Sequence, residues 1–185
     1  MENKELVLIE ACQRGDSEAF GQLYDRYFKK IYSFIYYKVS QKETTEDLVS
    51  DIFIKVLANI NKFDSQRGNF SSWLYRIARN TVIDYYRVNK QVYNLDNIIE
   101  LSSEDNLDNS MDVNISLEEV KQKLYKLKEQ QQDIIILRVW QQLSYKEISD
   151  IVGKSEASCK MVFARSIKEL RLSLLTMLWL AILIN

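Results

Sequence analysis

The sequence contains no proline, no histidine and only four glycines among its 185 residues. Proline averages about 5% of protein residues, and sheets with many tight turns depend on proline and glycine. Their scarcity predicts an all-α fold. The missing histidine removes the commonest general base and the commonest metal ligand. With no glycine-rich phosphate loop visible either, we expect neither a metal site nor a cofactor.

Cysteine is also scarce, since only Cys12 and Cys159 are present and neither lies in a C-x-x-C motif. This pattern argues against a zinc site or a disulfide framework and favours a reducing cytoplasm. The start of the chain, M-E-N-K-E-L-V, lacks the basic region and apolar run of a signal peptide. We expect Cys159 to be a small buried hydrophobe rather than a nucleophile. Because no reaction class can be assembled from these residues, the sequence predicts a protein that is not an enzyme.

The formal net charge of −1 hides an uneven distribution of charged residues along the chain. Residues 91–119 contain eight acidic and no basic side chains, whereas residues 120–185 contain 11 basic and 6 acidic ones. The acidic stretch is also rich in asparagine and serine, which is typical of a mobile linker. We therefore expect two small helical domains, at residues 1–91 and 116–172. An acidic linker at residues 92–115 would join them, and a hydrophobic tail would follow at residues 173–185.

Four helical segments are predicted in the N-terminal domain, at residues 2–14, 17–39, 44–60 and 69–87. Gly15 suits a left-handed stop after the first segment. Thr44 and Asp47 have the spacing of a capping box at the start of the third.

The segment 69–87 combines three arginines, three tyrosines and a tryptophan. On a helical wheel, one arc would face a core and contains Phe70, Trp73, Leu74, Ile77, Thr81 and Tyr85. The opposite arc contains Tyr75, Arg76, Arg79, Asn80, Tyr86 and Arg87, together with Ser72 and Ile83. Exposed rings and guanidiniums suit single-stranded nucleic acid, because bases stack on the rings while the cations hold phosphates. The alternative is a surface helix whose arginines cover its own tyrosines.

The third segment also has two distinct faces. Its predicted core arc consists of Val49, Ile52, Phe53, Val56 and Ile60. The opposite arc consists of Asp47, Asp51, Ile54, Lys55 and Ala58. It therefore places the aliphatic Ile54 among charged side chains. This arc is either a solvated face with an Asp51–Lys55 ion pair or a docking surface for a partner helix.

In the C-terminal half, one helix is predicted to begin near Ser116 and another to span residues 127–142. A helix at residues 144–152, a turn at 153–155 and a helix from 156 onward would follow. The last helix would direct a set of side chains toward a DNA major groove: Ser158, Lys160, Met161, Ala164 and Arg165. Helix-turn-helix patterns also occur in proteins that bind no DNA, but the basic charge of this half favours DNA binding.

Stretches from three parts of the chain, in this order, resemble the sigma factors of the extracytoplasmic-function (ECF) class, over the chain up to about Leu172. The stretches E-A-F-G-Q-L-Y-D-R-Y and E-D-L-V-S-D-I-F-I-K-V resemble the first parts of sigma region 2. The stretch F-S-S-W-L-Y-R-I-A-R-N-T-V-I-D-Y-Y-R resembles its promoter-melting helix. The stretch L-K-E-Q-Q-Q-D-I-I-I-L-R-V-W-Q-Q-L-S-Y-K-E-I-S-D-I-V-G resembles region 4.

The resemblance implies a subunit of bacterial RNA polymerase that directs promoter-specific initiation. It implies contact with the clamp helices of the largest polymerase subunit through Asp47, Asp51, Ile54 and Lys55. It implies that the minus-ten strand is held, with one base flipped out, by Trp73, Tyr75, Arg76, Arg79, Asn80 and Arg87. It implies that the minus-thirty-five duplex is read by Ser158, Lys160, Met161 and Arg165. The flap of the second-largest subunit and an anti-sigma factor are the other partners that it implies.

A rival interpretation is a stand-alone helix-turn-helix regulator that binds duplex operators without polymerase. Such a regulator would not use an aromatic and arginine-rich face that suits single strands.

The hydrophobic tail from Leu172 to Ile184 has only two polar residues, Ser173 and Thr176. As a helix it would be about 20 Å long, shorter than the roughly 30 Å core of a bilayer. We expect it to continue the preceding helix and to pack against this protein or a partner. Membrane association through this tail is the alternative.

Overall fold

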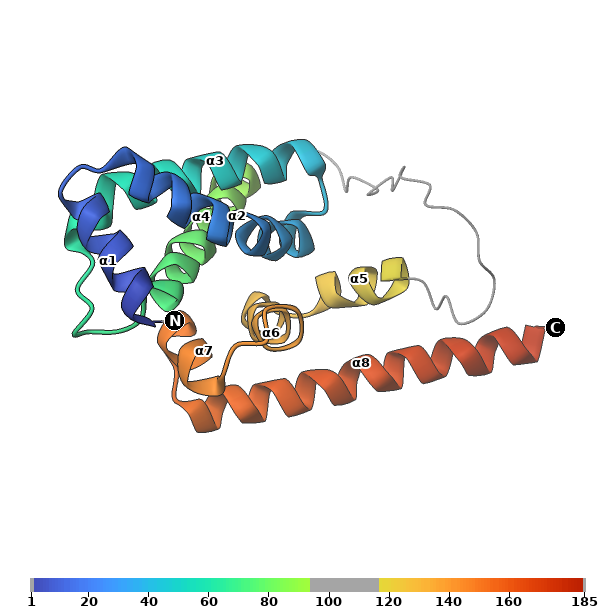
Figure 1. Ribbon diagram of the computed structural model, residues 1–185. Helices are drawn as coiled ribbons and strands as arrows, with labels where there is room; N and C mark the ends of the chain where they lie inside the picture. The colour runs from blue at the N-terminus through green and yellow to red at the C-terminus, as the bar shows by residue number, and fades with distance from the viewer. Residues whose placement is uncertain (1, 94–116, 185) are drawn as a thin grey trace.

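The computed structural model describes the backbone of residues 2–93 and 117–184, and the side chains of residues 4–88 and 122–171 (Figure 1). The described residues form helices and connecting turns without any strand, so the predicted all-α fold is confirmed. In chain order the elements are α1 (Glu2–Gln13), α2 (Ser17–Val39), α3 (Lys42–Asn59), the short 3₁₀ helix η1 (Ile60–Lys62), α4 (Phe70–Tyr93), α5 (Leu117–Lys126), α6 (Glu129–Ile135), the π-helical segment η2 (Ile136–Trp140), α7 (Tyr145–Val152) and α8 (Glu156–Ile184). The predicted acidic linker, residues 92–115, lies outside the described residues except for residues 92 and 93, which belong to α4.

The N-terminal domain consists of α1–α4, and its core forms where the apolar faces of these helices meet. In α2, the large apolar residues Ile31, Phe34 and Ile35 are fully buried in this core. The core arc predicted for the third segment is buried at all five of its positions. The first helix ends before Gly15, whose φ of 91° is the left-handed conformation that glycine adopts readily.

The predicted start of the third helix is wrong, because α3 begins at Lys42 and not at Thr44. Ser40, the C-cap of α2, has a left-handed φ of 53°. Gln41 is extended and is the N-cap of α3. The Thr44 hydroxyl donates to the side-chain oxygen of Gln41 at 3.0 Å instead of capping the helix itself. A two-residue connection after α2 therefore replaces the longer loop that the capping-box spacing predicted.

The C-terminal domain consists of α5–α8 and contains the predicted helix-turn-helix. Ser144 caps α7 in a reciprocal capping box with Glu147, and Gly153 ends α7 with a φ of 68°. The predicted helix over residues 127–142 is divided instead into α6 and η2. The π-helical turn of η2 ends at Trp140, and Gln142 has a left-handed φ of 55°. Such single π turns occur often at functional positions in helices.

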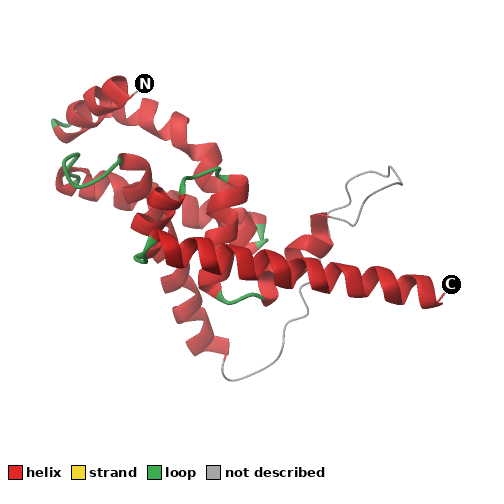
Figure 2. Ribbon diagram, turned by 90° about the horizontal axis from the view of Figure 1, so that it is seen from below, coloured by secondary structure: helices red, strands yellow, loops and turns green. Residues whose placement is uncertain are grey.

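The helix α8 continues without a break to Ile184, as predicted for the hydrophobic tail (Figures 1 and 2). The predicted packing of the tail lies outside the described side chains. Among the described residues, no helix is long and apolar enough to cross a membrane.

The two domains pack directly against each other (Figure 1). The helix α4 lies against α7, and α2 lies against η2. Tyr37 of α2 and Trp140 of η2 form a ring pair with a centroid distance of 4.6 Å. The contact between the two domains therefore determines what surrounds the aromatic and arginine-rich helix α4.

Candidate nucleic-acid and polymerase interfaces

The first turn of α4 is held in place by Asn69. The side-chain oxygen of Asn69 accepts from the backbone N–H of Ser72 at 2.7 Å, which caps one of the free donors of the helix. The Trp73 ring packs against Phe63 and Phe70, with centroid distances of 5.6 Å to each. Trp73 is thus half-buried at the edge of the core, on the arc that was predicted for it.

The prediction that Tyr75 and Ser72 lie on the exposed arc of α4 is wrong. Tyr75 is only 1% exposed, its ring packs edge-on against Phe34, and its hydroxyl donates to Gln141 at 2.8 Å. Ser72 is buried as well. Burial raises the pKa of the Tyr75 phenol well above its ordinary value. A single-helix wheel cannot predict this burial, because α2 and a second domain cover the side of α4 that the wheel assigned to solvent.

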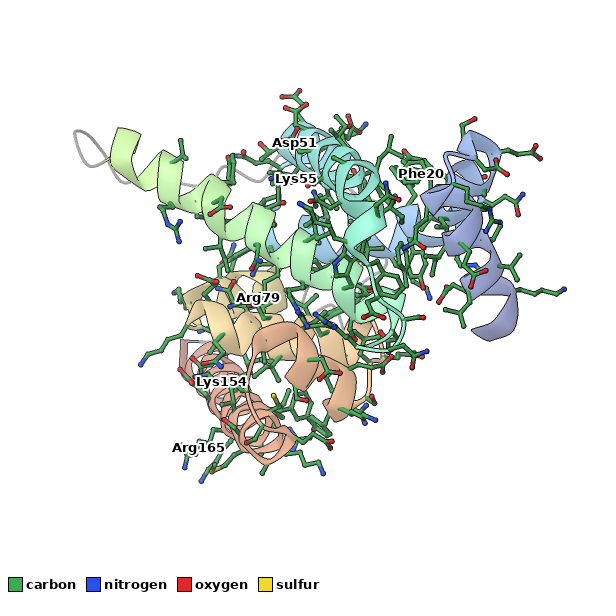
Figure 3. All side chains as sticks on the ribbon, turned by 90° about the vertical axis from the view of Figure 1, so that its left-hand side faces the viewer. Phe20, Asp51, Lys55, Arg79, Lys154 and Arg165 are labelled. Carbon is green, nitrogen blue, oxygen red and sulfur yellow. The ribbon has the colours of Figure 1, made fainter. Side chains whose placement is uncertain are left out.

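Arg76 and Arg79 point from α4 toward the C-terminal domain. Arg76 donates to the backbone carbonyl of Asp150 at 2.9 Å. The Nε atom of Arg79 donates to Asp133 at 2.6 Å, and its Nη2 atom lies 3.5 Å from a carboxylate oxygen of Glu129. In Figure 3, Arg79 lies at the boundary between α4 and the C-terminal helices. Both guanidiniums are therefore already engaged by protein groups.

The remaining members of the predicted strand-binding set, Asn80 and Arg87, are exposed on α4. Arg87 forms an ion pair with Asp84 across 3.2 Å, one turn earlier in the same helix. Such an exposed pair is weak, and it leaves Arg87 accessible to an anion. Only part of the predicted set is thus accessible in this conformation.

Lys38 and Asp133, which the sequence pattern did not single out, form a buried ion pair between the domains. Lys38 Nζ donates to Asp133 Oδ1, while the other oxygen of the same carboxylate accepts from Arg79. The side chains of Lys38 and Asp133 are 1% and 0% exposed. The signal in the sequence was a single charge inside the apolar run Y-Y-K-V for Lys38, and directly before the apolar run I-I-I-L for Asp133. A charge in such a run requires a partner once it is buried.

The predicted polymerase-binding residues Asp47, Asp51, Ile54 and Lys55 lie together on the exposed face of α3. In Figure 3, Asp51 and Lys55 lie on the side of the molecule away from α6–α8. Ile54 is 66% exposed, and Leu57, which the sequence analysis did not select, is 53% exposed. Lys55 donates to the Thr81 hydroxyl of α4 at 3.0 Å instead of forming the predicted pair with Asp51. The large aliphatic side chains of Ile54 and Leu57 are therefore exposed to solvent on the same helix as the carboxylates of Asp47 and Asp51.

The predicted duplex-reading residues lie on the first turns of α8. Lys160 and Arg165 are exposed, Met161 is 51% exposed, and Ser158 is half-buried. Lys160 lies over the Tyr145 ring at 5.6 Å, and Arg138 lies over the same ring at 4.8 Å. Arg165 and Lys154 lie on the outer side of this domain in Figure 3, away from the N-terminal domain. This face remains open while the domains are packed together.

Two family models match most of the chain. The model described as Sigma-70 region 2 matches residues 23–92, and the model described as Sigma-70, region 4 matches residues 117–170. The chain belongs to the sigma-70 family. Its two domains are therefore named region 2 and region 4 from here on.

Curated relatives place this sigma factor in the ECF class. It is 36% identical to the ECF RNA polymerase sigma factor BldN of Streptomyces coelicolor, over 89% of this chain and 64% of BldN. It is 33% identical to the ECF RNA polymerase sigma factor SigW of Bacillus subtilis, over 88% of this chain and 92% of SigW. Identity to the sigma factor YlaC of the same organism is 32%, over 83% of this chain and 91% of YlaC. Members of this family are initiation factors and not enzymes, as the sequence predicts for this chain.

Two solved structures share the fold of this sigma factor. CnrH in complex with the cytosolic domain of CnrY is similar at a TM-score of 0.71 and 23% identity, over 91% of this chain and 95% of CnrH. RpoE of Bartonella quintana in complex with the anti-sigma factor NepR is similar at a TM-score of 0.69 and 24% identity, over 82% of this chain and 94% of RpoE. Both similarities extend over region 2 and region 4.

Both cysteines of this sigma factor are buried in its cores. Burial raises the pKa of each thiol above its ordinary value, which disfavours the reactive thiolate. The prediction of Cys159 as a small buried hydrophobe is thus confirmed.

Proposed function

We propose that this sigma factor binds core RNA polymerase through the exposed face of α3 and directs initiation at promoters with two DNA elements. The observation that carries the proposal is the pair Ile54 and Leu57, which are 66% and 53% exposed beside Asp47 and Asp51. Aliphatic side chains this exposed, rimmed by charge, are typical of a docking surface for a partner. The resemblance of α3 to the family's polymerase-binding helix gives the occupant as the clamp helices of the largest subunit.

The proposed minus-ten site lies on α4. Arg76, Arg79, Asn80 and Arg87 would hold the phosphates and base edges of the non-template strand, and Trp73 would support the loop in front of the helix. Base flipping costs a few kcal/mol, and stacking at about 1–3 kcal/mol per base can offset this cost without ATP. The buried ring of Tyr75 supports a packing role for this residue rather than direct stacking on a base.

The proposed minus-thirty-five site is the outer face of α8. Lys160 and Arg165 are exposed there and would contact the duplex, with Ser158 and Met161 between them. The neighbouring surface of region 4 would contact the flap of the second-largest polymerase subunit. Since this face is open in the packed conformation, duplex binding needs no rearrangement of the domains.

An anti-sigma factor is a proposed partner, since the similar proteins CnrH and RpoE were solved in complexes with CnrY and the anti-sigma factor NepR. The proposed location is the cytoplasm, where core polymerase and DNA are found. The rival interpretation, a stand-alone regulator, is not retained, because the chain carries region 2 as well as region 4 of the sigma family.

The test is run-off transcription of genomic fragments with core polymerase, with and without the protein. The protein should produce transcripts from defined start sites that core polymerase alone does not produce. Ile54→Glu should abolish these transcripts and co-elution with core polymerase, because a carboxylate cannot enter an apolar contact. The matched control is Val7→Glu, at a residue of α1 that is 58% exposed and outside the proposed site. Equal transcription by both variants would contradict the α3 assignment.

A further inference from the structure

The helix α1, which has no part in the proposed function, is bonded through its last residue to the segment in front of α4. The side-chain nitrogen of Gln13 donates to the backbone carbonyls of Ile60 and Phe63, at 3.0 Å each. A side-chain amide has two N–H donors, and Gln13 uses both of them here. The two carbonyls lie in and directly after η1, where the helical hydrogen bonds of α3 and η1 end. We call these two bonds the Gln13 anchor.

The segment that follows the Gln13 anchor, residues 64–69, is named the approach loop. All of its residues are exposed, whereas Phe63 before it and Phe70 after it are buried. The loop contains a short turn at Asp64, whose carboxylate accepts from a backbone N–H two residues later at 2.9 Å. The path of the loop is therefore determined by this turn and by its two ends, and at one end Gln13 holds the backbone.

The approach loop presents polar side chains that can bond the edge of a base. Ser65, Gln66 and Arg67 supply a hydroxyl, an amide and a guanidinium. The Arg67 side chain is 87% exposed, and its ion pair with Asp64 is of the weak, exposed kind. A base taken out of the stack is read by hydrogen bonds to its edge. Because the loop leads directly into α4, these groups precede the helix that is proposed to hold the minus-ten strand.

We propose that Gln13 is a positioning residue for minus-ten recognition, because its two bonds fix the direction in which the approach loop leaves η1. Gln13 is half-buried and acts through the backbone of the loop, not by touching DNA. The recognition part of this proposal rests on the proposed function of α4. The anchoring part rests on the described hydrogen bonds alone.

Base reading and phosphate binding depend differently on the position of the loop. A hydrogen bond to a base edge weakens steeply as its angle falls below about 120°. The attraction between a cation and a phosphate falls only with the inverse of their distance. An approach loop released from Gln13 should therefore lose selectivity between bases and keep most of its affinity for the strand. This pattern distinguishes a positioning residue from one that only stabilises region 2.

The first measurement tests the anchor in the full-length protein, without polymerase or DNA. Gln13→Met keeps the length of the side chain and removes both donors, and Gln22→Met is the matched control at an exposed glutamine of α2. Trypsin cleaves after arginine, so the rate of cleavage after Arg67 reports how often the loop is released. Gln13→Met should raise this rate roughly 5- to 25-fold, since each lost bond favours the released loop about fivefold. An unchanged rate would overturn the anchor.

The second measurement uses the holoenzyme with core polymerase, on a promoter fragment found by the run-off test and substituted at each minus-ten position in turn. A mismatched base pair typically lowers binding about 5- to 150-fold. Gln13→Met should reduce this discrimination about fivefold at one position, while the other positions and the salt dependence stay unchanged. Ile35→Val is the control for general destabilisation, because it removes one methylene group from the core of region 2.

The outcomes separate this proposal from the function on which it rests. Faster cleavage after Arg67 without any loss of base selectivity would overturn the recognition part and leave the anchor in place. An equal loss of selectivity in Ile35→Val would also overturn it, because stability alone would then explain the effect. If the wild-type holoenzyme distinguishes no bases at minus ten, the proposed function of α4 fails and the recognition part fails with it. The trypsin result decides the anchor in every case.

Discussion

At the scale of single residues, burial rather than residue type decides what each side chain on α4 can do. Tyr75 and Tyr86 are both tyrosines on the arc predicted to face solvent, yet they have different surroundings. Tyr75 is enclosed between Phe34 and Gln141, whereas Tyr86 is partly exposed and donates to the backbone carbonyl of Lys38 at 2.6 Å. The aromatic content of the helix is therefore shared between the fold and the surface.

Variants of Tyr75 test this division. Tyr75→Phe keeps the ring and loses only the bond to Gln141, so it should lower the free energy of unfolding by about 1 kcal/mol. Tyr75→Ala leaves a cavity and should lower it by about 3–5 kcal/mol. Urea denaturation monitored by circular dichroism measures both changes. A change below about 0.5 kcal/mol for the alanine variant, typical of surface positions, would contradict the packing role.

Apolar periodicity predicted the buried arc of α3 in region 2 well, and it failed where one domain covers the other. The core arc of α3 was correct because its neighbours α2 and α4 follow the same amphipathic rule. Tyr75, Lys38 and Asp133 were misplaced or not identified, since their burial depends on contacts between residues far apart in the sequence. Nothing in the local pattern indicates which distant surface will meet a helix.

At the scale of elements, the helices were predicted where cap residues and apolar spacing agree. The capping box of Ser144 and the left-handed Gly153 determine the ends of α7, in agreement with the predicted helix at residues 144–152 and turn at 153–155. The division of the predicted helix 127–142 into α6 and η2 could not be predicted from the sequence, because the apolar run Ile134–Leu137 has no glycine or proline to mark a change of pitch. Tertiary contact with α2 accompanies the π turn there.

The exposed face of α8 makes a prediction about salt dependence. Lys160→Ala and Arg165→Ala should each weaken binding to promoter duplexes. Loss of a phosphate contact should reduce the salt slope by about one unit, whereas loss of a base contact should cost roughly 1–3 kcal/mol and relax preference at one position. Binding isotherms at several salt concentrations distinguish the two. Lys29→Ala, at an exposed lysine of α2, is the control, and unchanged binding in both α8 variants would contradict the placement of the recognition helix.

At the scale of the whole molecule, the continuous helix α8 joins the proposed DNA-reading face to the hydrophobic tail. Truncation after Arg171 should therefore leave duplex binding intact and reduce thermal stability or the capture of a protein partner, because the apolar residues that follow need a covering surface. Thermal denaturation and co-purification of the full-length and truncated proteins measure these effects. Full-length protein that fractionates with membranes, beside a soluble truncated form, would support membrane association instead.

The bonds that Arg76 and Arg79 form with region 4 also affect how strongly the free protein attaches to non-specific DNA. A genome offers about 10⁶–10⁹ non-specific sites, and each freed phosphate-binding cation strengthens attachment to all of them through counterion release. In the packed arrangement these two guanidiniums bind Asp150 and Asp133, so they contribute less to non-specific attachment than free cations would.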